Sequence, residues 1–121
     1  MAIRDLFRRR QTRIPADPAD LAHFRSWCET RVGIEAYLEP ETLVSVPGLL
    51  LIAFDGEWTR RPVGDVATAR KLADQLKIPL YDAMETGYPD RMRLFEEVRI
   101  SRERKERARR LREQMRGADE G

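Results

Sequence analysis

The sequence predicts a small α+β (α/β) fold in which helices flank a small mixed sheet, in the order α-β-β-β-α-β-α. Three observations predict it: apolar residues recur at helical spacing, an Asp-Gly pair separates two strand-like runs, and a helix-length segment precedes a last short strand. With 121 residues, 41% of them hydrophobic, the chain can bury one modest core. We expect a globular domain over 17–98, a basic N-terminal arm over 1–16 and a basic helical C-terminal extension over 99–121.

The first helix is expected to begin after Asp17, which can cap it, with Pro18 at its first position and Gly33 as its stop. His23 lies off the apolar stripe of this helix and is expected to be exposed. The stripe itself is expected to be buried, and it consists of Leu21, Phe24, Trp27, Cys28 and Val32.

Three strands are expected next. Residues 34–39 alternate apolar and polar side chains, which is typical of a strand with one solvent-facing side. Residues 49–54 form a continuous apolar run, which favours a central strand covered on both faces. Asp55-Gly56 then predicts a hairpin into residues 57–63, where Pro62 marks a strand end or a sheet edge. The second hairpin strand is expected to place Trp58 and Arg60 on one face and Glu57, Thr59 and Arg61 on the other.

The remaining elements follow from caps and prolines. Asp65 can cap a second helix that ends near Lys77, and residues 79–83 then form a short strand. A strand, helix and strand of this length fit a right-handed crossover that gives a parallel pair. Pro89 predicts the start of a long final helix over about 90–116, held in solvent beyond its first turns by glutamate–arginine pairs three or four residues apart.

Charge is distributed unevenly, although the formal net charge is only +2. Residues 1–13 carry +4 and residues 99–116 carry +6, whereas residues 14–98 carry −6. Basic ends on an acidic body predict that contact with an anionic polymer or an anionic lipid surface is made through the ends.

Several kinds of site are excluded by composition. Cys28 is the only cysteine and His23 the only histidine, so we expect no disulfide framework, no metal site and a cytoplasmic protein. The longest apolar run, over 49–54, is too short for a transmembrane segment. The chain has no glycine-rich phosphate loop, so we expect no cofactor, and no residue is predicted to be catalytic.

The order of elements over 17–83 resembles the common core of the restriction-endonuclease-like nucleases. The resemblance implies a metal ion held by an acidic residue and an acidic-x-Lys element on the central hairpin, which serves phosphodiester cleavage. The nearest match here is Asp55 and Glu57, but Thr59 stands where the lysine is expected. Two alternatives follow: a nuclease-like scaffold without chemistry, or a divergent metal-dependent nuclease.

Four segments, 33–40, 55–61, 78–83 and 87–93, resemble a group of small actinobacterial proteins, some of which are labelled oxidoreductases. The label implies a redox cofactor, but the matching positions include no cofactor motif. No reaction and no functional residue is transferred from the group.

Within these segments several side chains are not explained by folding alone. If the last helix docks near the hairpin, they form a patch suited to stacking on a base or holding a phosphate or carboxylate. The alternative is that the arginines pair with nearby carboxylates of Glu57, Asp90, Glu96 and Glu97. The possible ligand patch consists of Trp58, Arg60, Arg61, Tyr88, Arg91 and Arg93.

The sequence as a whole favours a non-enzymatic small binding protein whose arginine-rich ends engage an anionic partner, RNA or a ribonucleoprotein. A protein–protein interaction module is the alternative, in which the long C-terminal helix pairs through Val98, Ala108, Leu111 and Met115. Peripheral membrane contact through residues 1–13 is a further expectation. The residues expected to contact nucleic acid are Arg8, Arg9, Arg10, Arg104, Arg107, Arg109 and Arg110.

Overall fold

The computed structural model describes residues 16–42 and 46–120 and confirms the predicted fold class. Its elements follow the predicted order, with one addition: a short helix, α4, stands between the last strand and the long final helix. The elements are α2 (Pro18–Glu29), β1 (Glu35–Glu39), β2 (Gly48–Ile52), β3 (Trp58–Pro62), α3 (Val66–Leu76), β4 (Leu80–Asp82), α4 (Ala83–Thr86) and α5 (Asp90–Glu120).

The four strands form one mixed sheet in the order β3-β2-β1-β4. β2 pairs antiparallel with both β1 and β3, and β4 pairs parallel with β1, so the connection through α3 passes from one edge of the sheet to the other. β2 is an interior strand, and its apolar run Leu49–Ile52 is fully buried, as expected. β3 ends at Pro62 on an edge, which confirms the position expected for that proline.

The hairpin is confirmed, but its loop has three residues rather than two. The Ala53 N–H donates to the Glu57 carbonyl (2.8 Å), and the Gly56 N–H donates to the Ala53 carbonyl (3.0 Å). Gly56 has φ +94°, which suits the third residue of such a loop, where the backbone turns left-handed. Phe54 therefore belongs to the loop rather than to the strand, and it is 76% exposed.

The first helix begins as expected and ends early. The Asp17 side chain accepts from the Ala19 N–H (2.8 Å), with Pro18 at the first position. The helix ends at Glu29, so the expectation that it extends to Gly33 is wrong, and Val32 lies beyond the helix and is 76% exposed. The second helix begins after its predicted Asp65 cap and ends at Leu76, next to the predicted Lys77, which is its C-cap and adopts the left-handed conformation.

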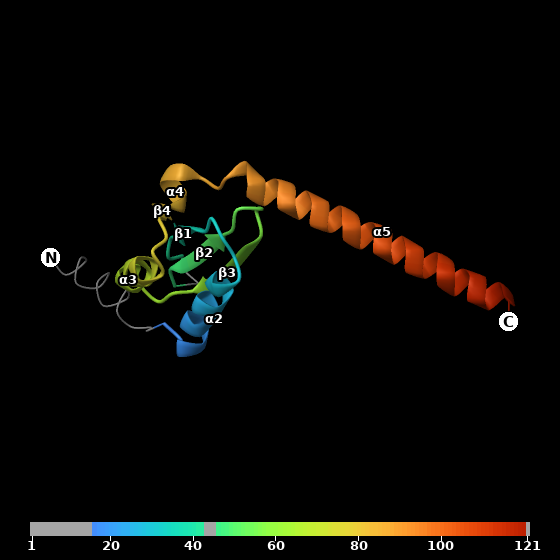
Figure 1. Ribbon diagram of the computed structural model, residues 1–121, viewed down its shortest axis with the longest axis horizontal. Helices are drawn as coiled ribbons and strands as arrows, with labels where there is room; N and C mark the ends of the chain where they lie inside the picture. Colours follow the sequence, from blue (N-terminus) through green and yellow to red (C-terminus); the bar gives the residue numbers. More distant parts are fainter. Residues whose placement is uncertain (1–15, 43–45, 121) are drawn as a thin grey trace.

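Helices cover both faces of the sheet (Figure 1). α2 and α3 pack on one face, where Phe24, Trp27 and Leu72 join the side chains of β1 and β2 in the main core. On the other face Tyr37, 5% exposed, packs with Ala83 of α4 and is joined by Met92 of α5. The expectation of a solvent-facing side on the first strand is therefore wrong, because α4 and the start of α5 cover that side.

α5 is the feature that gives the molecule its shape. Its first turns touch the body, and the rest extends away from it as a single rod (Figure 1). No helix of the described residues is both long enough and apolar enough to cross a membrane.

Candidate nucleic-acid interface

The first turns of α5 are fixed to the body by side chains that lie within two turns of one another. The Arg91 Nε donates to the Ala53 carbonyl (3.0 Å), and the same guanidinium forms an ion pair with Glu35. The Trp58 Nε1 donates to Glu96 (2.8 Å). Together these contacts set the direction in which the helix leaves the body.

Gly56 lets the tip of the hairpin approach the backbone of α5. A Cβ atom placed there would lie 2.0 Å from the Arg91 carbonyl oxygen and 2.9 Å from the Cβ of Phe95. Only glycine allows this approach, and only glycine adopts its φ of +94° without strain. The Asp-Gly pair thus turns the hairpin and also seats the long helix.

Beyond Arg99 the helix carries its charge in solvent. All side chains described over 99–119 are exposed except that of Glu106, which is half-buried. Among the described residues none of them makes an ion pair outside α5, and the Arg99–Glu96 pair lies within the base of the helix itself. The +6 charge of residues 99–116 is therefore not neutralised by the acidic body.

An α-helix completes a turn every 3.6 residues, so residues spaced alternately by three and four lie on one face. One such set contains cations alone. Four of its five members form no ion pair within the described part of the chain, and the fifth, Arg109, contacts Glu106 (2.6 Å). We call this set the basic row: Arg102, Lys105, Arg109, Arg112 and Arg116.

A neighbouring set, the mixed row, holds the acidic residues. Arg99 bridges Glu96 and Glu103 at 2.7 Å each, and Arg110 contacts Glu106 (3.4 Å). The Arg99 guanidinium lowers the pKa of Glu96, and Arg109 lowers the pKa of Glu106, because each donates a hydrogen bond to the carboxylate. These pairs confirm the ion pairs expected at i+3 and i+4 for Glu103 and Glu106, whereas Glu113 forms none within the described residues. The mixed row consists of Arg99, Glu103, Glu106, Arg110 and Glu113.

A third set, the apolar row, is exposed as well. Leu111 is 57% and Met115 61% exposed. Val98 was expected to take part in helix pairing together with these residues. It does not share their face, since its spacing places it in line with the basic row. The apolar row consists of Ala108, Leu111, Met115 and Ala118.

The arginines expected to contact nucleic acid are spread over these faces. Arg109 lies in the basic row and Arg110 in the mixed row, whereas Arg104 continues the apolar row and Arg107 lies on none of the three. Arg8, Arg9 and Arg10 lie outside the described residues, as does the segment 1–13 expected to contact membranes. The basic row was missed because counting charge along a segment does not separate the faces of a helix.

The residues of the predicted ligand patch do not form one site, because their ion pairs hold them in different places. Arg60 holds Glu39 with two hydrogen bonds (2.6 and 3.0 Å), and its guanidinium lies 5.3 Å from the centre of the Trp58 ring. The Tyr88 hydroxyl donates to the same carboxylate (2.5 Å), and burial raises the pKa of this tyrosine. Two of the six predicted residues, Arg60 and Tyr88, thus bind Glu39, whereas Trp58 lies beside Arg60 and donates to Glu96.

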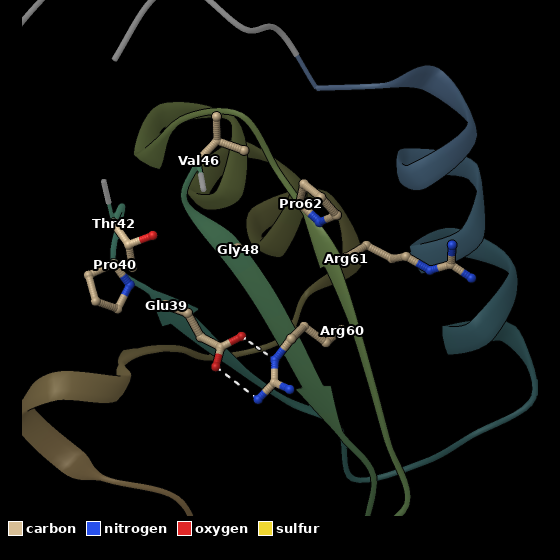
Figure 2. Close-up of a pocket in the computed structure, with 8 residues that line it drawn as sticks. All are labelled: Glu39, Pro40, Thr42, Val46, Gly48, Arg60, Arg61 and Pro62. Atoms are coloured by element: carbon tan, nitrogen blue, oxygen red, sulfur yellow. Dashed lines mark hydrogen bonds and ion pairs between the residues drawn. The ribbon is translucent and has the colours of Figure 1, made fainter. Parts of the chain in front are cut away.

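The other arginines of this patch point elsewhere. Arg61 points to the opposite face of β3, toward Asp20 of α2 (3.8 Å), whereas Arg60 turns toward Glu39 across a groove of about 450 Å³ (Figure 2). Arg93 pairs with Glu97 along α5 (3.3 Å). The faces predicted for the hairpin strand are confirmed, and every arginine of the predicted patch has a carboxylate partner.

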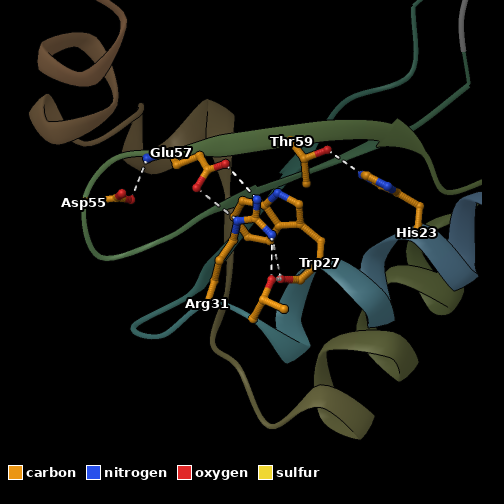
Figure 3. A network of polar contacts seen from close by, with 7 residues as sticks. His23, Trp27, Arg31, Asp55, Glu57 and Thr59 are labelled. Atoms are coloured by element: carbon orange, nitrogen blue, oxygen red, sulfur yellow. Dashed lines mark hydrogen bonds and ion pairs between the residues drawn. The ribbon is translucent and has the colours of Figure 1, made fainter. Parts of the chain in front are cut away.

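The two acidic residues of the nuclease-like motif, Asp55 and Glu57, also accept hydrogen bonds from other groups of the protein. Glu57 receives two hydrogen bonds from Arg31 (2.8 and 3.0 Å), and this guanidinium lies 4.4 Å from the centre of the Trp27 ring (Figure 3). Asp55 accepts from the Glu57 N–H (3.0 Å) in the hairpin loop. Among the described residues, no three histidine, cysteine or carboxylate side chains gather as they would around a metal ion.

Two further polar groups lie near this network. The His23 Nε2 lies 2.6 Å from the Thr59 hydroxyl, and burial together with Arg61 lowers the pKa of the imidazole. Expected to be exposed, His23 is in fact half-buried against β3. Burial raises the pKa of the Cys28 thiol, which disfavours the reactive thiolate.

Comparison of the chain with protein-family models, with curated proteins and with solved structures finds no match. The resemblances to the nuclease core and to the small actinobacterial proteins stay predictions.

Proposed function

We propose that this protein binds RNA, alone or within a ribonucleoprotein, through phosphate contacts made by α5. The observation that supports the proposal is a rod of surplus positive charge held away from the acidic body. Arginine and lysine side chains that neutralise phosphates release the counterions of the nucleic acid, and this release supplies affinity without reading sequence.

The charge of the body supports the same assignment. Residues 14–98 carry −6, so the folded centre repels a polyanion while the extension attracts it. On the body, the arginines of the predicted ligand patch are held by carboxylates, which leaves the extension as the stronger phosphate-binding surface among the described residues.

The test is the salt dependence of RNA binding by the full chain. Five phosphate contacts give a slope of log affinity against log salt of about −4. Affinity is then expected to fall a few hundredfold between 50 and 200 mM salt, as measured by fluorescence anisotropy with a labelled RNA. Salt-insensitive binding, or the absence of binding at 50 mM salt, would overturn the proposal.

A chain that ends after Ser101 is the matched comparison. It removes the basic row but keeps the hydrogen bonds and the ion pair that join α5 to the body, since these involve Arg91 and Glu96. We expect it to keep the circular dichroism and unfolding midpoint of the body and to lose most RNA affinity. Full affinity in the truncated chain would place binding elsewhere.

One observation favours a second candidate, a protein–protein interaction through α5. The exposed apolar row recurs at the spacing of a helix-pairing seam. For this candidate we expect sedimentation of the nuclease-treated protein to show self-association or a complex with a discrete protein partner. The Leu111→Ser substitution should abolish that association. A monomer that binds RNA equally well with Leu111→Ser would exclude this candidate.

A further inference from the structure

The geometry of α5 points to a particular RNA partner, and the inference rests on the proposed function. We infer that the basic row of α5 binds the phosphate backbone of double-stranded RNA, lying along its shallow minor groove, rather than single-stranded RNA. The row, the rigidity of the rod, its lack of aromatic residues and the position of its carboxylates all support this inference.

The basic row is a straight line of charge. From Arg102 to Arg116 the row covers 15 residues, or about 21 Å for the 14 rises of 1.5 Å between them, with one cation about every 5 Å. A duplex offers phosphates at positions fixed in advance, so a rigid row meets several of them at once. A single strand would have to be ordered along the helix, and that ordering costs conformational entropy.

The rod has no group on which unpaired bases can stack. Phe95 is the last aromatic residue of the sequence, and it is half-buried at the base of α5 beside Gly56. Proteins that bind single strands combine a basic surface with aromatic platforms, each worth about 1–3 kcal/mol per stacked base. Because α5 has the charge without the platforms, it favours a backbone ligand whose bases are already paired.

The carboxylates decide which groove suits the helix. Glu106 and Glu113 lie beside the basic row, since the first contacts Arg109 and both raise its pKa through their charge. A helix inserted in the deep major groove of B-form DNA approaches phosphates on both sides, which would bring these glutamates against one wall. The minor groove of A-form RNA is wide and shallow, so a helix can present one face to it and leave its acidic face in solvent.

The experiment compares two triple variants of the full chain with equal loss of charge. One removes three cations of the basic row (Arg102→Gln, Lys105→Gln, Arg112→Gln), and the other removes three from the remaining faces (Arg104→Gln, Arg107→Gln, Arg110→Gln). The ligands are a 24-base-pair RNA duplex, one of its strands alone, and the DNA duplex of the same sequence, all measured by fluorescence anisotropy across a salt series.

For the wild-type chain we expect the RNA duplex to bind at least tenfold more tightly than either the single strand or the DNA duplex. The basic-row variant should lose at least tenfold in duplex affinity and flatten the salt slope by about 2.7, or 0.9 for each lost phosphate contact. The variant of the other faces should change that slope by less than about 1. Helix content from circular dichroism checks that both variants keep α5.

The outcomes separate this inference from the proposed function. Equal affinity for single strand and duplex, or equal losses in the two variants, overturns the inference and leaves RNA binding in place. Tighter binding of the DNA duplex overturns the choice of A-form RNA. Absence of binding to any of the three ligands at 50 mM salt overturns the proposed function, and the inference with it.

Discussion

Substituting Gly56→Ala should loosen the junction between the hairpin and α5. The added Cβ would lie 2.0 Å from the Arg91 carbonyl oxygen and 2.7 Å from its carbonyl carbon, whereas ordinary contact begins at 3.4 Å. The clash is with backbone, so no side-chain rotation relieves it. Either the hairpin tip or the first turn of α5 must move by more than 1 Å.

Two contributions set the size of the effect. A residue with a Cβ at φ +94° is strained by about 1–2 kcal/mol. Forcing extra volume into a packed junction costs about 1–3 kcal/mol more. We therefore expect Gly56→Ala to lower the free energy of unfolding by about 3 kcal/mol. The tryptophan fluorescence should also change, because Trp58 hydrogen-bonds Glu96 of the displaced helix.

Urea unfolding followed by circular dichroism and tryptophan fluorescence measures this loss. Gly87→Ala is the matched control, since Gly87 also has a positive φ (+65°) but a Cβ there would meet nothing within 4 Å. The control carries the strain without the clash, and because its ψ of −171° lies in a region nearly restricted to glycine it should lose about 1–3 kcal/mol. If Gly56→Ala were no more destabilising than Gly87→Ala, the close approach of hairpin and helix would be refuted.

Two further predictions concern the contact between α2 and β3. A double-mutant cycle of Arg31→Met and Glu57→Gln should give a coupling of about 1 kcal/mol in the free energy of unfolding. The reason is that the ion pair is bidentate and only half-exposed. A coupling near zero would contradict this prediction. The lowered pKa of His23 means that the unfolded chain binds its proton more readily, so stability should fall as pH drops below the ordinary value of 6.5. Urea midpoints between pH 7.5 and 5 should therefore fall more for the wild type than for His23→Gln, and equal falls would count against the burial of His23 beside Arg61.

Elements with local signals were predictable from the sequence. Asp17 and Asp65 cap helices because a short acidic side chain reaches the free backbone N–H groups of the next turn, and this depends only on nearby residues. The apolar run of β2 was readable for a similar reason, since four successive buried side chains require cover on both faces. The hairpin followed from Asp55-Gly56, although the loop took in Phe54 as well.

Features that depend on distant segments were not predictable. Tyr37 alternates with apolar neighbours as a solvent-facing residue would, and only the placement of α4 and α5 over the sheet shows that it is buried. The carboxylate partners of Arg60 and Arg91 come from β1, more than 20 residues away in the chain. Charge shows that these arginines need partners, but the sheet register decides the glutamate that Arg60 meets, and the docking of α5 decides the one that Arg91 meets.

The length of α5 explains how an acidic body and a basic surface coexist in one small chain. Arg109 lies about 15 Å along the axis beyond Arg99, the last residue to bond a side chain at the base of the rod. At physiological ionic strength a charge is screened over about 8 Å, so the outer part of the basic row is largely independent of the body. A shorter helix would hold the same cations within reach of carboxylates that oppose them. Holding the row at a distance therefore supports the proposed binding of RNA by α5, because the repulsion from the negative body is then weakest where the cations lie.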